Sequence, residues 1–249
     1  MGQQIFLNPG EIYHGSINVV NLSSSVDDLS YQVNILPYSV VGSEYSANFL
    51  ARSSYNEIID WINIENPTGV LSPNESKTVN YTITVPEDAA PGGQYASLSV
   101  LSEPSNNSSN GLSIGNVYEI ASLIYANVAG DIHREGSVLE NSIPSFSVNN
   151  SIKVTAILDN KGNTHEDAIF SFNISNTITG ETIFPKANDN TRYSEIIMPD
   201  TTREISHDFT DLPMAGVVKI SQTINYGGEV STTEQTVVIC PIWLMTLAA

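Results

Sequence analysis

The chain has 249 residues, enough for one large or two ordinary domains, and a formal net charge of −18 from 27 acidic and 9 basic side chains. A chain this acidic repels phosphate groups, which excludes nucleic acids and anionic lipid headgroups as leading partners. Because 41% of its residues are hydrophobic, the chain can still bury a core. Its polar surface is built mainly from 31 Ser, 25 Asn and 18 Thr.

Alternating apolar residues predict strands throughout the first half. The clearest case is 78–85, where Val79, Tyr81 and Ile83 share one side and the small polar residues Thr and Asn occupy the other. This alternation is typical of an antiparallel sheet with one buried face and one wet face. In chain order, strands are expected over residues 16–22, 29–36, 78–85, 94–101 and 117–128. The Asn- and Ser-rich residues 104–111 are expected to form a mobile hairpin loop.

The second half shows the same pattern, with turns rich in Asn and Gly between the strands. Strands are expected over residues 152–158, 168–175, 182–184, 193–198, 203–209, 216–224 and 230–239. About seven short strands in each half is the number typical of an immunoglobulin-like sandwich. We therefore predict an all-β fold of two tandem immunoglobulin-like β-sandwiches, with domains at 1–132 and 133–240.

Both ends of the chain suggest an exported protein that has been shortened. Residues 1–6 lack the basic and long apolar regions of a signal peptide, so either the protein is not exported or its leader was removed; we expect the second. From Val237 to the end the chain is apolar and uncharged, but shorter than the ~20 residues of a membrane-spanning helix. Trp243 within this run suits a membrane interface. We predict that 241–249 begin a transmembrane anchor, the alternative being a strand tail packed on its own domain.

Cysteine and histidine offer little chemistry. The single cysteine, Cys240, excludes an intrachain disulfide or a Cys-rich zinc site, and its apolar surroundings favour a buried thiol. His14, His133, His165 and His207 are dispersed, and we expect surface or strand-edge imidazoles. A zinc site would need the fold to bring His165, His207 and a carboxylate together.

Oxygen-bearing side chains are densest at residues 159–167, from Asp159 to Asp167. Calcium prefers such ligands, but the spacing is not that of an EF-hand, and a hairpin turn is the simpler interpretation. Whether a cation binds there is left open. Other carboxylate pairs suit solvated loops, and a catalytic pair could be drawn from any of them: Asp27 with Asp28, Glu87 with Asp88, and Asp208 with Asp211.

Tyrosines cluster ahead of the first tryptophan. Tyr38, Tyr45 and Tyr55 precede Trp61, and exposed rings of this kind can stack on sugars or anchor a protein interface. The alternative is that Trp61 and every second tyrosine belong to the sandwich core.

The order of motifs in the first half resembles the peptidoglycan-binding domain of bacterial WxL-interacting proteins. A strand bearing Trp61 is followed by a turn containing Pro73, a further strand, Val85-Pro86 and then Pro91-Gly92. In the second half, 159–163 and 198–204 are similar to turns of that family's C-terminal domain. The resemblance implies an exported protein with these two domains in this order, ending in a transmembrane helix.

Together these features predict a binding protein and not an enzyme. We predict a non-catalytic module outside the cell, anchored at the cell surface by a C-terminal transmembrane segment, that recognises cell-wall peptidoglycan or another surface protein. One alternative is a strand-accepting assembly factor or scaffold for surface proteins, marked by an open edge strand without Lys, Pro or bulges. Another is a cell-wall hydrolase accessory, marked by convergent carboxylates in a cleft. No catalytic residue, metal or cofactor is predicted, and the binding residues and oligomeric state are left unassigned.

Overall fold

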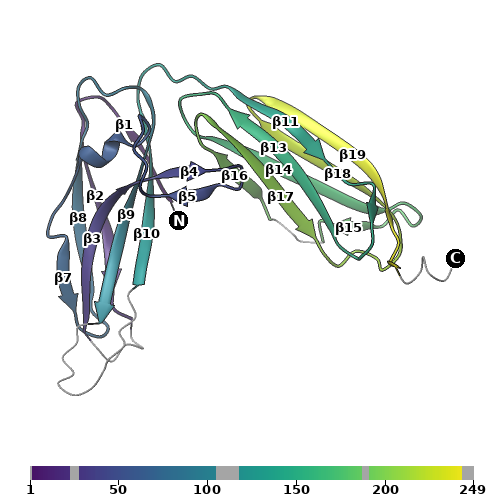
Figure 1. The fold of residues 1–249 in the computed structure, drawn as a ribbon, viewed down its shortest axis with the longest axis horizontal. Helices are drawn as coiled ribbons and strands as arrows, with labels where there is room; N and C mark the ends of the chain where they lie inside the picture. Colours follow the sequence, from purple (N-terminus) through teal and green to yellow (C-terminus); the bar gives the residue numbers. More distant parts are fainter. Residues whose placement is uncertain (1, 23–27, 105–117, 187–190, 243–249) are drawn as a thin grey trace. The chain divides into compact units, whose positions relative to one another are not determined.

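The computed structural model describes residues 2–22, 28–104, 118–186 and 191–242, and within them the chain is mostly β-strand (Figure 1). The chain divides into two compact units. The first is Met1–Val41 with Ser46–Ile132, and the second is Gly42–Tyr45 with His133–Ala249. Each unit has its own hydrophobic core between β-sheets, which confirms the predicted fold class of two immunoglobulin-like β-sandwiches.

The first unit packs a five-stranded sheet against a three-stranded sheet. The larger sheet has the order β1 (Gly2–Leu7), β10 (Tyr118–Val128), β9 (Gly92–Pro104), β3 (Leu29–Pro37) and β7 (Thr68–Leu71). The smaller has the order β2 (Ile12–Val20), β8 (Ser76–Thr84) and β6 (Ile62–Ile64). A hairpin of β4 (Ser39–Val41) and β5 (Ser46–Asn48) follows β3, and a 3-10 turn, η1 (Glu57–Asp60), precedes β6.

The predicted alternation of apolar and polar residues in β8 is observed in the core of the first unit. Val79, Tyr81 and Ile83 of β8 are buried, and their neighbours Thr82 and Thr84 are not. These side chains meet apolar residues of the larger sheet, among them Leu98 of β9. Core burial of this kind supplies most of the favourable free energy of folding.

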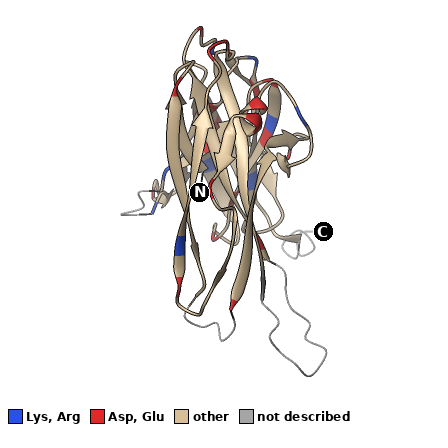
Figure 2. Cartoon of the chain, turned by 90° about the vertical axis from the view of Figure 1, so that its left-hand side faces the viewer, with Lys and Arg blue, Asp and Glu red and all other residues tan. Residues whose placement is uncertain are grey.

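The second unit also consists of two sheets with a core between them. One sheet has the order β11 (Gly136–Ser142), β13 (Ile152–Asn160) and β17 (Thr201–Phe209). The other has the order β12 (Phe146–Ser147), β19 (Glu229–Ile239), β18 (Gly216–Tyr226), β14 (Glu166–Asn176) and β15 (Thr182–Phe184), with β16 (Tyr193–Ile197) also pairing with β14. Charged residues occur both on strands and in loops, and most of the ribbon carries none (Figure 2).

The structure contradicts the predicted membrane anchoring by a C-terminal helix. The part of the chain that the structure describes holds no helix that is both long and apolar enough to span a bilayer. The backbone N–H of Cys240 donates to the carbonyl oxygen of Ser147 at 2.9 Å, and Pro241 is buried, so the start of the apolar run packs on its own unit. The plasma-membrane partner and the anchored location inferred from this segment are withdrawn with it. Residues 243–249, and the loop residues 105–111, lie outside the described residues.

A tyrosine ring lies on a glycine in the smaller sheet of the first unit. Gly15 and Tyr81 are directly paired between β2 and β8, and a Cβ atom on Gly15 would lie 2.2 Å from Tyr81 Cζ. The hydroxyl of Tyr81 donates to Gln3 Oε1 at 2.7 Å. Burial raises the pKa of Tyr81 to about 12, so the hydroxyl keeps the proton that it donates.

We predict that Gly15→Ala lowers the free energy of unfolding by about 1–3 kcal/mol, because the buried ring has to move. Urea unfolding of the first unit, followed by Trp61 fluorescence in a Trp243→Phe background, measures the change. The exposed neighbour provides a control, and Ser16→Ala is expected to change stability by less than about 0.5 kcal/mol. In a Tyr81→Leu background the cost of Gly15→Ala is expected to shrink, and equal costs in both backgrounds would contradict the account.

Candidate functional site

One strand of the larger sheet in the first unit has an incompletely covered edge. β10 pairs antiparallel with β9 along its whole length, from Tyr118 opposite Ser102 to Val128 opposite Gly92. On its other side β1 runs parallel to it and pairs from Gly2 opposite Leu123 to Leu7 opposite Val128. No strand among the described residues therefore pairs with residues 119–121 on that side (Figure 1). Open edges of this kind can accept another strand through backbone hydrogen bonds.

The open stretch lacks the usual features that protect an edge. Residues 119–121 are Glu, Ile and Ala, without Lys or Pro, and the register against β9 is unbroken. Ile120 is 70% exposed. The carboxylate of Glu119 accepts a hydrogen bond from the hydroxyl of Ser99 on β9, so it lies toward the sheet and not across its open edge.

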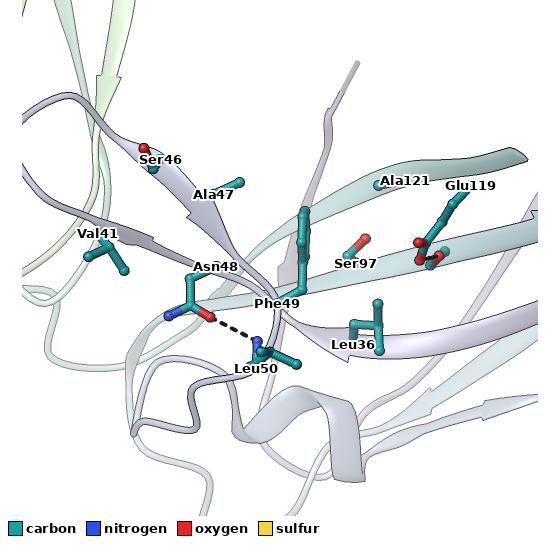
Figure 3. A pocket seen from close by; sticks show the side chains of 11 residues that line it. Leu36, Val41, Ser46, Ala47, Asn48, Phe49, Leu50, Ser97, Glu119 and Ala121 are labelled. Carbon is teal, nitrogen blue, oxygen red and sulfur yellow. Dashed lines mark hydrogen bonds between the residues drawn. The ribbon is translucent and has the colours of Figure 1, made fainter.

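A cavity of about 670 Å³ lies on the outer face of the same sheet, beside the open edge. Its floor is formed by side chains of three adjacent strands: Leu36 of β3, Ser97 and Ser99 of β9, and Glu119 and Ala121 of β10. Its other wall is formed by Val41 and residues 46–50 of the β4–β5 hairpin and the following loop (Figure 3). The volume is in the range of sites that hold small ligands or inserted side chains.

Local hydrogen bonds shape the wall of the cavity. The side-chain Oδ1 of Asn48 accepts the backbone N–H groups of Leu50 at 2.9 Å and Ala51 at 3.2 Å. This Asx turn bends the chain directly after β5 and places Phe49 and Leu50 on the cavity.

The predicted aromatic cluster does not form one sugar-stacking surface. Tyr38 is buried and packs edge-on against the ring of Tyr125, with centroids 5.9 Å apart. Trp61 is half-buried against the first core, as the core interpretation expected. Tyr55 is half-buried, and Tyr45 belongs to the second unit, where the guanidinium of Arg203 lies 4.5 Å from the centre of its ring.

The histidines are not brought together with carboxylates as ligands. His14 and His133 are exposed, and His133 Nε2 lies 2.9 Å from Glu135 Oε2. His165 is buried, whereas His207 packs on the ring of Phe172 with centroids 4.7 Å apart. Within the described residues, no three His, Cys, Asp or Glu side chains are grouped as a metal site would require.

Residues 159–167 form a hydrogen-bonded turn between β13 and β14. Asp159 Oδ1 accepts the hydroxyl of Thr202 at 2.7 Å, and Asn160 Oδ1 accepts the N–H of Gly162 at 2.9 Å. The side-chain amide of Asn160 donates to the carbonyl oxygens of Thr164 and Ile197. These internal bonds agree with the turn interpretation of the sequence.

The paired carboxylates occupy separate surface positions where they are described. Glu87 and Asp88 are exposed in a loop, and Asp208 is exposed on β17. Asp211 lies 3.9 Å from the ammonium group of Lys186. Asp27 lies outside the described residues.

Sequence reasoning missed the cavity and its wall residues. The small residues Ser97, Ser99 and Ala121 alternate along β9 and β10 opposite the core-facing side, and this was the available signal. The hairpin wall and the stopping point of β1 leave no periodic pattern in the sequence.

Comparison with known proteins gives structural matches only. No protein-family model and no curated protein matches the chain. Among solved structures, it is similar to the Escherichia coli chaperone DraB, at 13% identity and a TM-score of 0.44 over 95% of this chain and 94% of that one. It is also similar to the CsuC–CsuE chaperone–tip adhesion subunit complex of Acinetobacter baumannii, at 14% identity and a TM-score of 0.42 over 92% of this chain and 94% of that one. The Salmonella enterica SafA pilin–SafB chaperone complex matches at 11% identity and a TM-score of 0.42, over 95% of this chain and 93% of that one.

These findings correct the family resemblance. The likeness to WxL-interacting proteins is wrong, because no such family matches and the structural matches are titled as chaperones and pilus proteins. The peptidoglycan partner and the anchored cell-surface adhesion role that followed from it are withdrawn. Matches this distant concern the fold, which does not fix function.

Two histidines of the second unit are expected to make its stability depend on pH. Burial lowers the pKa of His165. The nearby charge of Arg134 lowers this pKa further, and that of Asp167 opposes the change. Burial also lowers the pKa of His207, against Glu195 and Asp208. The unfolded chain takes up these protons near the ordinary pKa of about 6.5, so it binds more protons than the folded chain below that pH. The stabilisation is complete above about pH 6.5 and is lost as the pH falls toward the lower folded values.

We predict that the second unit loses stability as the pH falls below about 6.5, and that the double substitution His165→Gln and His207→Gln flattens this slope. Urea unfolding at each pH, followed by NMR signals of the second unit, measures the slope. His14 lies in the first unit and supplies the control, and His14→Gln is expected to leave the slope measured for the second unit unchanged. An equal slope in the double variant and the parent chain would exclude these histidines as the cause.

Proposed function

We propose that the chain is a non-catalytic assembly factor that binds an extended segment of a partner subunit by adding it to the open edge of β10. The observation that supports this most directly is the register of β1, which leaves residues 119–121 without a neighbouring strand among the described residues. In strand addition, backbone hydrogen bonds supply affinity and pockets for alternate side chains supply specificity. β10 meets both requirements. Its residues 119–121 have no neighbouring strand on one side among the described residues, and the side chains of Glu119 and Ala121 line the cavity beside the edge.

Other edges of the first unit suit this role less well. β7 borders the far side of the same sheet but has only four residues. β2 borders the smaller sheet, and the cavity of about 360 Å³ beside it is lined mainly by polar groups, including His14, Glu65 and Asn80. The β10 edge combines an exposed apolar side chain, Ile120, with a cavity that has a largely apolar wall.

The proposed partner is a subunit that exposes a strand before it is assembled. The CsuC–CsuE and SafA–SafB structures are titled as a chaperone with a tip adhesion subunit and a pilin with its chaperone. We propose a partner of that general class for this chain, on the strength of its own open edge. The acidic, hydroxyl-rich surface would limit non-specific association while the edge waits for its partner.

A substitution on the open edge tests the proposal. Peptides of about twelve residues are selected from a display library on the whole chain, and their dissociation constants are measured by calorimetry. We expect selected peptides with alternating apolar residues, and we expect Ile120→Lys to weaken binding roughly tenfold or more, because an edge lysine disfavours strand addition. N-methylation of the alternate peptide amides that face β10 is expected to abolish binding, since it removes the hydrogen-bond donors.

Val70→Lys is the matched control, because Val70 is 58% exposed on β7 at the opposite edge of the same sheet. Binding is expected to survive this change. A selection that yields no binder, or peptides that bind Ile120→Lys as tightly as the parent chain, would refute strand addition at β10.

A further inference from the structure

The cavity beside the open edge contains a buried hydroxyl that lacks a partner. Ser97 is fully buried, and its Oγ makes no hydrogen bond within the described part of the chain. Ser97 lies among the residues that line the cavity (Figure 3). A buried hydroxyl without a partner is unfavourable, and a bound polar group could supply the missing hydrogen bond.

Small side chains leave a path along the outer face of the sheet, from its edge toward Ser97. Ala121 on β10 is paired with Ser99 on β9, so two small residues lie side by side at the edge. Ser97 is two residues before Ser99 on the same face of β9, paired with Leu36 of β3. A side chain of an added strand opposite Ala121 can therefore extend over Ala121 and Ser99 toward Ser97.

The charges and rings of the cavity favour a cation at the end of that side chain. Glu119 is the one ionisable residue among those that line the cavity, and its carboxylate lies at the hydroxyl of Ser99. Leu36, Phe49 and Leu50 offer apolar surface to an aliphatic stem, and an aromatic face such as that of Phe49 attracts a cation.

We infer that the cavity binds an arginine side chain of the added strand, with its guanidinium at the Glu119 carboxylate and the Ser97 hydroxyl. Arginine is favoured over lysine because its planar group carries five donors, enough for both oxygen atoms at once. This inference rests on the proposed function, since the arginine is carried by the strand that pairs with β10.

Two strand peptides that differ in one residue test the inference. Acetyl-Thr-Val-Thr-Arg-Thr-Val-Thr-amide and its norleucine counterpart are titrated into the whole chain, and binding is measured by calorimetry. The arginine peptide is expected to bind about tenfold more tightly, as for a hydrogen bond to a charged group. Glu119→Gln and Ala121→Leu are each expected to reduce that ratio to about one, the first by removing the charge and the second by filling the path. Glu87→Gln, which changes an exposed glutamate in a loop, is the matched control and is expected to keep the full ratio.

The same experiment separates the cavity from the edge. If both peptides bind equally well and Ile120→Lys abolishes both, strand addition stands and the arginine inference is overturned. If neither peptide binds, strand addition fails, and the cavity is tested alone with acetyl-arginine methylamide. Shifts of the Ser97, Ser99 and Ala121 amide signals that disappear in Glu119→Gln would then support the cavity chemistry, and identical shifts with the norleucine analogue would refute it.

Discussion

The backbone pairing of β10 is the constraint on which the proposed function depends. Every residue of this strand is opposite a residue of β9, but β1 pairs with it only from Leu123 onward. Beyond that point the outward backbone groups of residues 119–121 have no partner strand among the described residues. Water can form hydrogen bonds with these backbone groups. An added strand can form them too, and it would also cover the exposed side chain of Ile120.

The edge and the cavity result from the same pleated geometry. Successive side chains of a strand point to opposite faces, so Leu98 and Ile124 enter the core while Ser97, Ser99 and Ala121 face outward. Residues of the hairpin that follows β3, and of the loop after it, form the other wall of the cavity. A strand added to β10 would place alternate side chains on this outer face, where the cavity can select among them.

Periodicity predicted the sandwich fold and most of the strands, because one buried face demands alternation, as at Val79, Tyr81 and Ile83. The site could not be predicted in the same way, since the end of β1 and the position of the hairpin depend on pairings between distant segments. The resemblance failed for a related reason: motifs such as Val85-Pro86 and Pro91-Gly92 begin and end strands in many sandwiches. The apolar residues that follow the last strand suggested a membrane anchor beginning at Pro241, although the structure buries Pro241.

Amide hydrogen exchange of the free chain, measured by NMR, tests the central claim most directly. The outward amides within residues 119–121 are expected to exchange rapidly, whereas the amides of Ile124 and Ala126 in the same strand, which lie between β1 and β9, are expected to be protected. Addition of a strand peptide is expected to slow exchange at 119–121 alone. Protection of all these amides before any peptide is added would contradict the account, because it would mean that the edge is already covered.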